Sequence, residues 1–571
     1  MKKLFTAALM ACFAGSTMAQ YYLTPRTPAY DLNASPKREI RAVWLTTLGN
    51  LDWPKTYATS PENIERQKKE LTDILDKYAA ANINTVLLQA RVRAATIYPS
   101  DYEPWDQCIT GRAGQAPGYG YDPLKFAVEE CHKRGMEIHA WLAAIPIGAS
   151  KALGAQRMRE RGFDVRSYST GAYVNPADPK IADYLAEICA EITRKYDIDG
   201  INLDYIRYPD SWPKASYREG DTPDERRANI TKIVRAIHDK VKALKPWVKI
   251  SCSPIGKHAD LMRYSSKGYN AREKVYQDAQ LWIKRGYMDQ LYPMQYFRDQ
   301  NYYPFCADWV ENSNGKDIVT GLGTYFLDPR EGSWTLADIK RQMYVSRSLG
   351  MGHAHFRSKY LTDNRQGVYD FERLFNFLPA IPPAMTWMGK KQPQQPKYRG
   401  KTGDLKTIDS DHRVTIAWRG NAPYYNIYAS FTYPVDVSDA RNLVFGRYAD
   451  CSFMVKTQSG RPLYYAITAM DRYGNESEPL QERRLTTDSR KEEFLAVDND
   501  KVMLPEEAAS MDTDFFLISS LAGNTIARKY VSSASPTKID VFSLPNGVYE
   551  LSAHSKRNKS VHRIGFFILK R

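Results

Sequence analysis

Short apolar runs alternate with longer amphipathic segments between residues 40 and 380, and this alternation strongly constrains the fold. Eight runs are typical of strands, and a helical segment follows each. The predicted strands span residues 40–47, 85–92, 137–144, 200–203, 248–256, 290–297, 318–326 and 352–358. Because strands separated by helices form parallel sheets, these units predict a closed (β/α)8 barrel over residues 37–380. An open doubly wound sheet is the alternative, although no GxGxxG motif follows an early strand.

The helix starts carry cap signals. Ser60-Pro61-Glu62 places a serine before a first-turn proline, and Asp178-Pro179 repeats the pattern with an aspartate. Further helices are predicted at residues 123–133, 179–196, 224–244, 271–284, 336–349 and 370–377, with a weaker segment at 306–312. The stretch between the strand at 137–144 and the helix at 179–196 is predicted to be a loop.

The alternation ends at the proline-rich segments IPPAM (381–385) and KKQPQQPKYRG (390–400). Short alternating strands follow, and YYAITAMDRYGNESEP (464–479) resembles the end of a fibronectin type III domain. The resemblance implies a β-sandwich over residues 383–487. Residues 490–571 are again strand-rich and are similar to the C-terminal β-domains of exported Bacteroidetes proteins, some of which are secretion or sorting tails. A third plain β-sandwich is the alternative.

The N-terminus predicts export. Lys2 and Lys3 precede an apolar run of residues 4–13, and small residues follow up to Ala19, which is typical of a secretory signal peptide over residues 1–19. This run is shorter than the ~20 residues that span a bilayer, and no later segment reaches that length. We expect a periplasmic or secreted protein that begins near Gln20. The alternative is a lipoprotein anchored through Cys12.

The net charge and the spacing of the cysteines limit the classes of partner, metal and cofactor that we expect this chain to bind. The net charge is +15, with basic residues interspersed among acids rather than gathered in a tract. Export argues against a nucleic-acid partner, whereas anionic envelope polymers suit a basic exported protein. The six cysteines after the signal peptide lack metal-binding spacing, so we expect buried free thiols and neither a metal nor a cofactor. Export also permits disulfides, whose pairing the sequence does not give. The oligomeric state is left open.

Candidate site residues lie where the predicted strands end, because barrel enzymes place reacting groups there. Asp204 ends the fourth strand in DGINLDYIRYP (199–209), a position that a core would not give to a carboxylate. Flat rings and hydrogen-bonding groups at the other strand ends suit a sugar. These residues are Gln89, Arg91, His139, Trp141, Asn202, Arg207, Gln295, Tyr296 and Tyr325, with His353, His355 and Arg357 on the last strand. Structural roles are the alternative: a lone histidine is often hydrogen-bonded in the core, and an arginine can pair with a barrel acid.

Several motifs in the barrel region occur together and in order: REIRAVWLTT, LLQARVRAATIYPSDYEPW, GMEIHAWL, YDIDGINLDYIRYP and HFRSKYL. With these motifs the region resembles the glycosyl-hydrolase-like family ten. The resemblance implies a (β/α)8 barrel, often with a fibronectin-type module, in exported bacterial enzymes. Some members act on peptidoglycan strands that have lost their stem peptides. The family positions carried over are Gln89, Arg91, His139, Trp141, Asp204 and Arg207.

The chain departs from related patterns at four positions. Ala143 stands where many members have a polar residue, and Tyr205 follows Asp204 where many have a second aspartate. The stretch also resembles the DGxDxDxE strand of chitinase-like enzymes, but Asn202 replaces the middle aspartate and Ile206 the glutamate. An isoleucine cannot protonate a glycosidic oxygen, so a second acid has to come from another strand.

Glycoside hydrolysis ordinarily needs two carboxyl groups. We expect Asp204 to be the nucleophile or base, kept ionised by Arg207 if that side chain points at it. The candidates for its partner are Glu103, Asp299, Asp328 and Glu331. The sequence therefore predicts an exported bacterial glycoside hydrolase, without a cofactor, that acts on an envelope or other polysaccharide. The alternatives are a non-catalytic carbohydrate-binding protein on a degenerate barrel, or a hydrolase of plant or host glycan.

Overall fold

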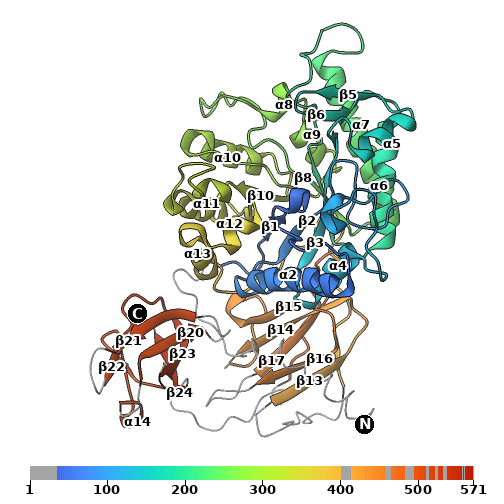
Figure 1. Ribbon diagram of the computed structural model, residues 1–571. Helices are drawn as coiled ribbons and strands as arrows, with labels where there is room; N and C mark the ends of the chain where they lie inside the picture. The colour runs from blue at the N-terminus through green and yellow to red at the C-terminus, as the bar shows by residue number, and fades with distance from the viewer. Residues whose placement is uncertain are drawn as a thin grey trace, which may run out of the picture. The chain divides into compact units, whose positions relative to one another are not determined.

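The computed structural model describes residues 35–399, 413–430, 432–456, 464–482, 494–509, 513–520, 525–531, 537–555, 557 and 560–569. The predicted signal peptide, residues 1–19, and Cys12 lie outside the described residues. The chain divides into two compact units. The barrel unit comprises Arg38–Arg373 and Pro382–Gly389, and the β unit comprises the described parts of the remainder (Figure 1).

The barrel unit contains a closed parallel barrel with the strand order β1-β11-β10-β9-β8-β7-β3-β2. Its strands are β1 (Arg41–Leu45), β2 (Thr85–Arg91), β3 (Glu137–Ala143), β7 (Gly200–Asp204), β8 (Lys249–Cys252), β9 (Gln290–Leu291), β10 (Asp317–Leu322) and β11 (Gly352–His355). The first and last strands close it, with Ala42 opposite Ala354. Each strand lies within or overlaps its predicted run, so the predicted (β/α)8 barrel is confirmed and the open sheet is wrong.

Helices connect the strands. The cap signal at Ser60 is confirmed, whereas the one at Asp178-Pro179 is wrong: that helix begins at Ile181, and Lys180 before it makes no side-chain cap hydrogen bond. The helices of eight residues or more are α2 (Pro61–Ala80), α4 (Pro123–Lys133), α5 (Leu153–Glu160), α6 (Ile181–Lys195), α7 (Pro223–Leu244), α10 (Tyr303–Glu311), α11 (Leu336–Ser348) and α13 (Val368–Phe375). Ser60 caps α2 by accepting a hydrogen bond from the backbone N–H of Asn63. The helix predicted at 271–284 is instead two short helices, α8 (Ala271–Lys274) and α9 (Ala279–Lys284). Tyr276 between them has a left-handed backbone with φ of 57°, which ends the helical path.

The predicted loop after β3 contains regular structure. Strands β4 (Pro146–Gly148), β5 (Val165–Tyr168) and β6 (Gly171–Val174) form an antiparallel sheet in the order β4-β6-β5, and α5 precedes β5. These strands are short, and β5 has no fully buried position, so its sequence lacks the apolar pattern of a core strand. This inserted sheet adds to the wall of the pocket described below.

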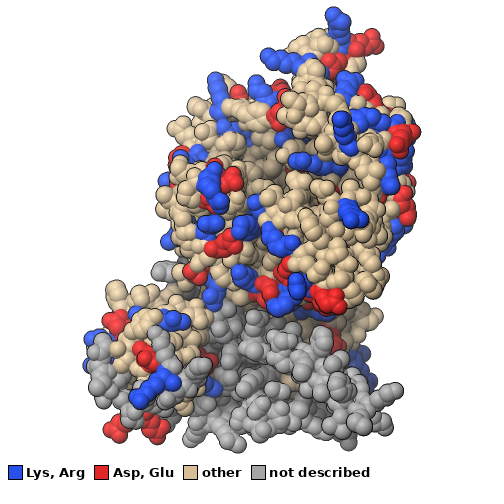
Figure 2. Space-filling model, in the orientation of Figure 1, with Lys and Arg blue, Asp and Glu red and all other residues tan. Residues whose placement is uncertain are grey.

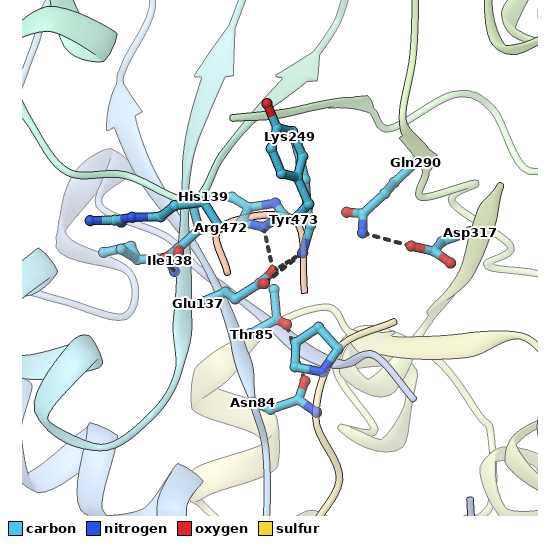
Figure 3. Close-up of polar contacts among 12 residues, drawn as sticks. Asn84, Thr85, Glu137, Ile138, His139, Lys249, Gln290, Asp317, Arg472 and Tyr473 are labelled. Carbon is cyan, nitrogen blue, oxygen red and sulfur yellow. Dashed lines mark hydrogen bonds and ion pairs between the residues drawn. The ribbon is translucent and has the colours of Figure 1, made fainter. Parts of the chain in front are cut away.

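The barrel interior changes character along its axis. Its apolar layer includes Trp44, Leu87, Trp141 and Tyr292. At the opposite end, where the strands begin, charged groups are paired and buried: Lys249 donates to both carboxylate oxygens of Glu137, at 2.5 and 2.6 Å (Figure 3). Gln290 donates to Asp317 beside them. Polar groups at the strand starts of a barrel serve stability.

The β unit is all-β apart from short helices, as predicted. It contains the sheets β12-β13-β16 and β15-β14-β17, followed by β18-β19-β22 and β21-β20-β23-β24. The short strands among them are β12 (Lys397–Tyr398), β18 (Val497–Asp498), β19 (Lys501–Met503) and β22 (Lys538–Asp540). The longer strands are β13 (Arg413–Arg419), β14 (Tyr424–Ser430), β15 (Leu443–Tyr448), β16 (Ser452–Lys456), β17 (Tyr464–Met470), β20 (Phe515–Ser520), β21 (Thr525–Tyr530), β23 (Gly547–His554) and β24 (Val561–Leu569). The fibronectin-type resemblance, the boundaries at 383–487 and 490–571 and the sorting-tail role stay predictions.

The described residues also show how surface charges, thiols and apolar helices are distributed. Acidic and basic side chains are interspersed on the barrel face seen in Figure 2, without a single-sign patch. The six predicted thiols are free; five are buried, and Cys451 is half-buried. No helix in the described part of the chain is long and apolar enough to cross a membrane.

Candidate active site

A cavity of about 630 Å³ opens where the barrel strands end. Its wall is formed by residues at or just beyond the ends of several strands, together with the inserted sheet. From the strand ends come Thr46, Gln89, Trp141, Ala143, Asp204, Met294, Tyr296, Tyr325 and Phe356, and from the insertion come Pro146, Gly148 and residues 170–173. Barrel enzymes use this end of the fold for binding and catalysis.

Asp204 lies in this cavity as the last residue of β7, and only 7% of its surface is exposed. The indole N–H of Trp141 donates to its Oδ2 at 3.1 Å, and the backbone N–H of Tyr205 donates to its Oδ1 at 2.7 Å. Burial raises the pKa of Asp204 to about 6, although these two hydrogen bonds and the charge of Arg207 favour the ionised form. The carboxyl group therefore titrates in a range where it can give or take a proton.

Arg207 favours the ionised form of Asp204, as expected, but its side chain binds a different carboxylate. Its Nη1 donates to Oδ2 of Asp210 at 2.9 Å, and its guanidinium lies 5.0 Å from the ring centroid of Tyr205. Arg207 therefore pairs with another acid. Its electrostatic attraction for Asp204 is smaller than the cost of burying the Asp204 carboxylate. Nor does Arg207 line the cavity. Ile206, where chitinase-like enzymes have a glutamate, is fully buried.

Glu331 is the second acid of the cavity wall; among the described residues, it and Asp204 are the carboxylates that line it. It follows the short helix η4 (Thr324–Leu327) after β10, is exposed, and accepts a hydrogen bond from the hydroxyl of Tyr360 at 3.0 Å. Of the four candidates from the sequence, Glu331 is the one that lines the cavity.

The other three candidates lie elsewhere. Glu103 is buried against Arg91, which it binds through both oxygens. Asp328 binds Arg330 at 2.8 Å, which holds the pKa of that carboxyl well below its usual range. Asp299 is exposed in the short helix η3 (Asp299–Asn301). None of them lines the cavity.

Aromatic rings form much of the wall around the two acids. The ring centroid of Tyr296 lies 5.5 Å from that of Phe356 and 5.6 Å from that of Tyr325. The hydroxyl of Tyr296 is buried and has no hydrogen-bond partner among the described residues, and burial with the nearby charge of Asp204 raises its pKa well above the usual value. A buried hydroxyl without a partner is costly, so a bound ligand that accepts its proton would gain a hydrogen bond.

Gln89 also lines the cavity and has a structural task. Its side-chain oxygen accepts hydrogen bonds from the backbone N–H groups of Thr47 and Leu48, at 3.1 and 2.9 Å. These bonds hold the loop after β1 against β2. The amide nitrogen has no partner among the described residues, so it can donate toward the cavity.

The remaining predicted binding residues are buried and do not line the cavity. Arg91 is fully buried and binds Glu103 and the carbonyl of Ala144. His139 contacts Glu137 at 3.3 Å, toward the strand starts. Asn202 bonds to Ser251 and Ser253, and Gln295 accepts from Thr320 at 2.8 Å. The alternation of these polar residues with apolar neighbours does not distinguish a polar residue that is buried within the fold from one that reaches the open end of the barrel.

Three described residues have metal-ligand chemistry and lie together: His353 and His355 on β11, and Glu372 on α13. Each imidazole Nε2 contacts one oxygen of Glu372, at 2.9 and 3.0 Å, and all three are buried. The carboxylate thus already binds both rings. Their neighbour Ala354 packs in the barrel core, so the alternation along the strand turns both histidines outward toward the helix.

Sequence reasoning missed part of the site. Arg93 is exposed, lines the cavity and lies just beyond the strand end that drew attention to Gln89 and Arg91. The sequence signal that could have indicated Arg93 was its position in the loop directly after β2. The inserted sheet was missed because its strands lack a core pattern.

Comparisons with known proteins agree with this architecture. The glycosyl hydrolase-like 10 family model matches residues 39–320. Glycosyl hydrolase YngK of Bacillus subtilis (strain 168) is 30% identical over 486 residues, which cover 78% of this chain and 93% of that protein. Glycosyl hydrolase DigH of Escherichia coli (strain K12) is 28% identical over 411 residues, covering 63% of this chain and 92% of that protein. The chain therefore belongs to the glycosyl hydrolase-like 10 family.

Proposed function

We propose that this protein is an exported bacterial glycoside hydrolase that cleaves an envelope or other polysaccharide. One observation carries the proposal: two carboxyl groups in contrasting environments, Asp204 and Glu331, line one aromatic cavity at the open end of a barrel. Membership in a glycosyl hydrolase-like family supports a hydrolase that acts on glycans. The two acids also speak against a degenerate, purely binding barrel.

The environments of the acids suggest their roles. Asp204 is buried with a pKa of about 6, which suits the group that protonates the leaving oxygen. Glu331 is exposed and hydrogen-bonded to Tyr360, which suits the anionic partner. The glycosidic C–O bond breaks as its oxygen takes the proton of Asp204. Glu331, or a water that it deprotonates, then forms the new bond to the anomeric carbon.

This assignment differs from the nucleophile or base role expected for Asp204 from the sequence. The reason is burial, which outweighs Arg207. Trp141 holds the carboxyl through its indole N–H, and Tyr296 offers a free hydroxyl beside it. Both groups would orient a sugar ring against the acid by hydrogen bonding and by contact with its apolar face.

An envelope glycan is the substrate class that we favour, with peptidoglycan strands stripped of their stem peptides as the first candidate. The predicted signal peptide supports an exported site of action. The net charge of +15 supports an anionic polymer. Plant and host glycans belong in the same test, since the aromatic cavity suits any pyranose.

The test is a panel of glycans that includes peptide-stripped peptidoglycan strands, intact peptidoglycan, and plant and host polysaccharides. Products are read as new reducing ends and by mass spectrometry. We expect the full chain to cleave at least one glycan and Asp204→Asn to lose that activity. Asp299→Asn, an exposed acid outside the cavity, is the matched control and should retain it. Full activity in Asp204→Asn, or saturable binding without turnover on every glycan, would contradict the proposal; the latter would indicate a carbohydrate-binding protein.

A further inference from the structure

The described charged groups of the cavity wall are not paired with one another. Four described side chains in the wall carry a charge: Asp204, Glu331, Arg93 and Arg357. Arg357 is paired, because its Nη1 binds the buried carboxylate of Asp52 and the carbonyl of Leu51. Its guanidinium also lies 5.0 Å from the ring centroid of Tyr360.

Arg93 is the other cation of this wall. It is exposed and makes no hydrogen bond or ion pair with any residue that the structure describes. Its charge is felt by Tyr205 on one side, where it lowers the pKa of the hydroxyl against larger raising effects, and by Asp106 on the other. Neither is within bonding distance, so the guanidinium keeps its five donors available.

The backbone around Arg93 is built to hold this position. Arg93 and Ala94 both have left-handed backbones, with φ of 56° and 62°, in a turn closed by the Val92 N–H bonded to the carbonyl of Ala95. Such angles are unfavourable for side-chain-bearing residues and persist only when the surroundings enforce them. Gly154 of α5 lies against the carbonyl of Ala94, where a methyl group would collide with the backbone. The insertion therefore packs on the turn that presents Arg93.

We propose that Arg93 is a specificity-determining residue that binds a carboxylate on the glycan. This inference rests on the proposed function and names the kind of sugar that the cavity takes. A planar guanidinium with free donors matches a carboxylate through two parallel hydrogen bonds, better than it matches a neutral hydroxyl. The carboxylate can be the lactyl ether of an amino sugar or the C6 group of a uronic acid.

Binding tests the inference separately from cleavage. The probes are an N-acetylglucosamine–N-acetylmuramic acid tetrasaccharide and tetragalacturonic acid, each as the free acid and as its methyl ester. The full chain is compared with Arg93→Gln, Arg93→Lys and the control Arg157→Gln, an exposed arginine of α5 outside the cavity. Dissociation constants are measured by calorimetry at low salt, since screening weakens exposed charge pairs.

We expect the full chain to bind at least one free acid on the order of 10- to 100-fold tighter than its ester. Arg93→Gln should abolish this preference, Arg93→Lys should retain part of it, and Arg157→Gln should retain all of it. The acid that shows the preference identifies the source of the carboxylate. Equal binding of acid and ester by the full chain, binding of neither acid, or a preference that survives in Arg93→Gln would overturn the inference. A preference without any glycan cleavage would refute the hydrolase and leave the role of Arg93 standing.

Discussion

Asp204 shows how one residue acquires chemistry from its position. The same carboxyl group on a surface loop would lose its proton at about pH 4, whereas at the end of β7 it is nearly covered and its pKa rises to about 6. Its two hydrogen-bond donors, Trp141 and Tyr205, come from a neighbouring strand and from the next residue. Burial in the folded protein therefore gives Asp204 a pKa at which it can act as an acid. The sequence shows only that an aspartate stands where an apolar residue is expected.

The raised pKa of Asp204 predicts a pH-dependent stability change in Asp204→Asn. Between about 3.9, the pKa of an unfolded aspartate, and about 6, the folded state binds more protons than the unfolded state. The free energy of unfolding of the wild type thus falls as the pH rises through this interval and then levels off. Asp204→Asn lacks this loss, so its relative stability should grow by roughly 2 kcal/mol from pH 4 to pH 7.

Urea unfolding at several pH values measures this difference. An asparagine cannot accept both hydrogen bonds, which lowers the stability of the variant by a similar amount at every pH and leaves the slope intact. A stability difference that does not change with pH would contradict the buried, protonatable state of Asp204. Asp299→Asn, at an exposed site, should show little slope of this kind.

The assigned roles predict different losses for the two acids. Asp204→Asn should lose roughly 100- to 10,000-fold in kcat on glycans, because general acid catalysis contributes that much. It should keep much of its activity on an activated aryl glycoside of the same sugar, whose leaving group needs no proton. Glu331→Gln should lose activity on both substrates.

The pH profile gives an independent check. With Asp204 as the acid, kcat/KM of the wild type should fall as the pH rises through about 6, and this limb should disappear in Asp204→Asn acting on the aryl glycoside. An activity that instead falls below pH 6 would assign Asp204 the base role and exchange the two acids. The anomer of the first product, read by NMR, distinguishes retention from inversion.

At the scale of elements, β7 depends on a close fit inside the barrel. Gly200 lies opposite His139 on β3, and a Cβ at Gly200 would be 2.7 Å from the imidazole ring. His139, which the sequence offered as a binding residue, therefore acts as a packing partner of the strand that carries Asp204. The histidine is fully buried, so it cannot move away into solvent.

Gly200→Ala should for this reason lower the free energy of unfolding by about 1–3 kcal/mol, the usual cost of overpacking a core. Activity should fall with it, since a displaced β7 moves Asp204. Gly118→Ala is the control, because Gly118 is exposed and a Cβ there meets nothing within 4 Å. Denaturant unfolding that shows equal, small effects for both variants would mean that His139 has room to move.

The whole molecule consists of two compact units, each with its own core. Two units of this kind are expected to unfold as separate cooperative steps. Calorimetry of the full chain should show two transitions, and Asp204→Asn should shift only the transition of the barrel unit. A single transition that moves as a whole in this variant would show that the units unfold together.

Much of the barrel could be predicted because its signals are local. The eight strands are buried on both faces and appear as apolar runs, while caps such as Ser60 mark helix starts. The insertion with β4, β5 and β6 could not be predicted, since its strands have only three or four residues each and β5 has no buried position. The candidate site was predicted in part: Asp204, Trp141, Gln89, Tyr296 and Tyr325 line the cavity, whereas Arg91, His139, Asn202, Arg207 and Gln295 do not.

The apolar period and burial of the strands are local signals, so the sequence was enough to predict the closed barrel and an acid at the end of its fourth strand. Three properties became visible only in the folded structure: which other acid lines the cavity with Asp204, which arginine of its wall has no partner among the described residues, and how far burial raises the pKa of Asp204. Those properties depend on desolvation and on distances between residues far apart in the sequence, such as Asp204 and Glu331. Local patterns do not carry them.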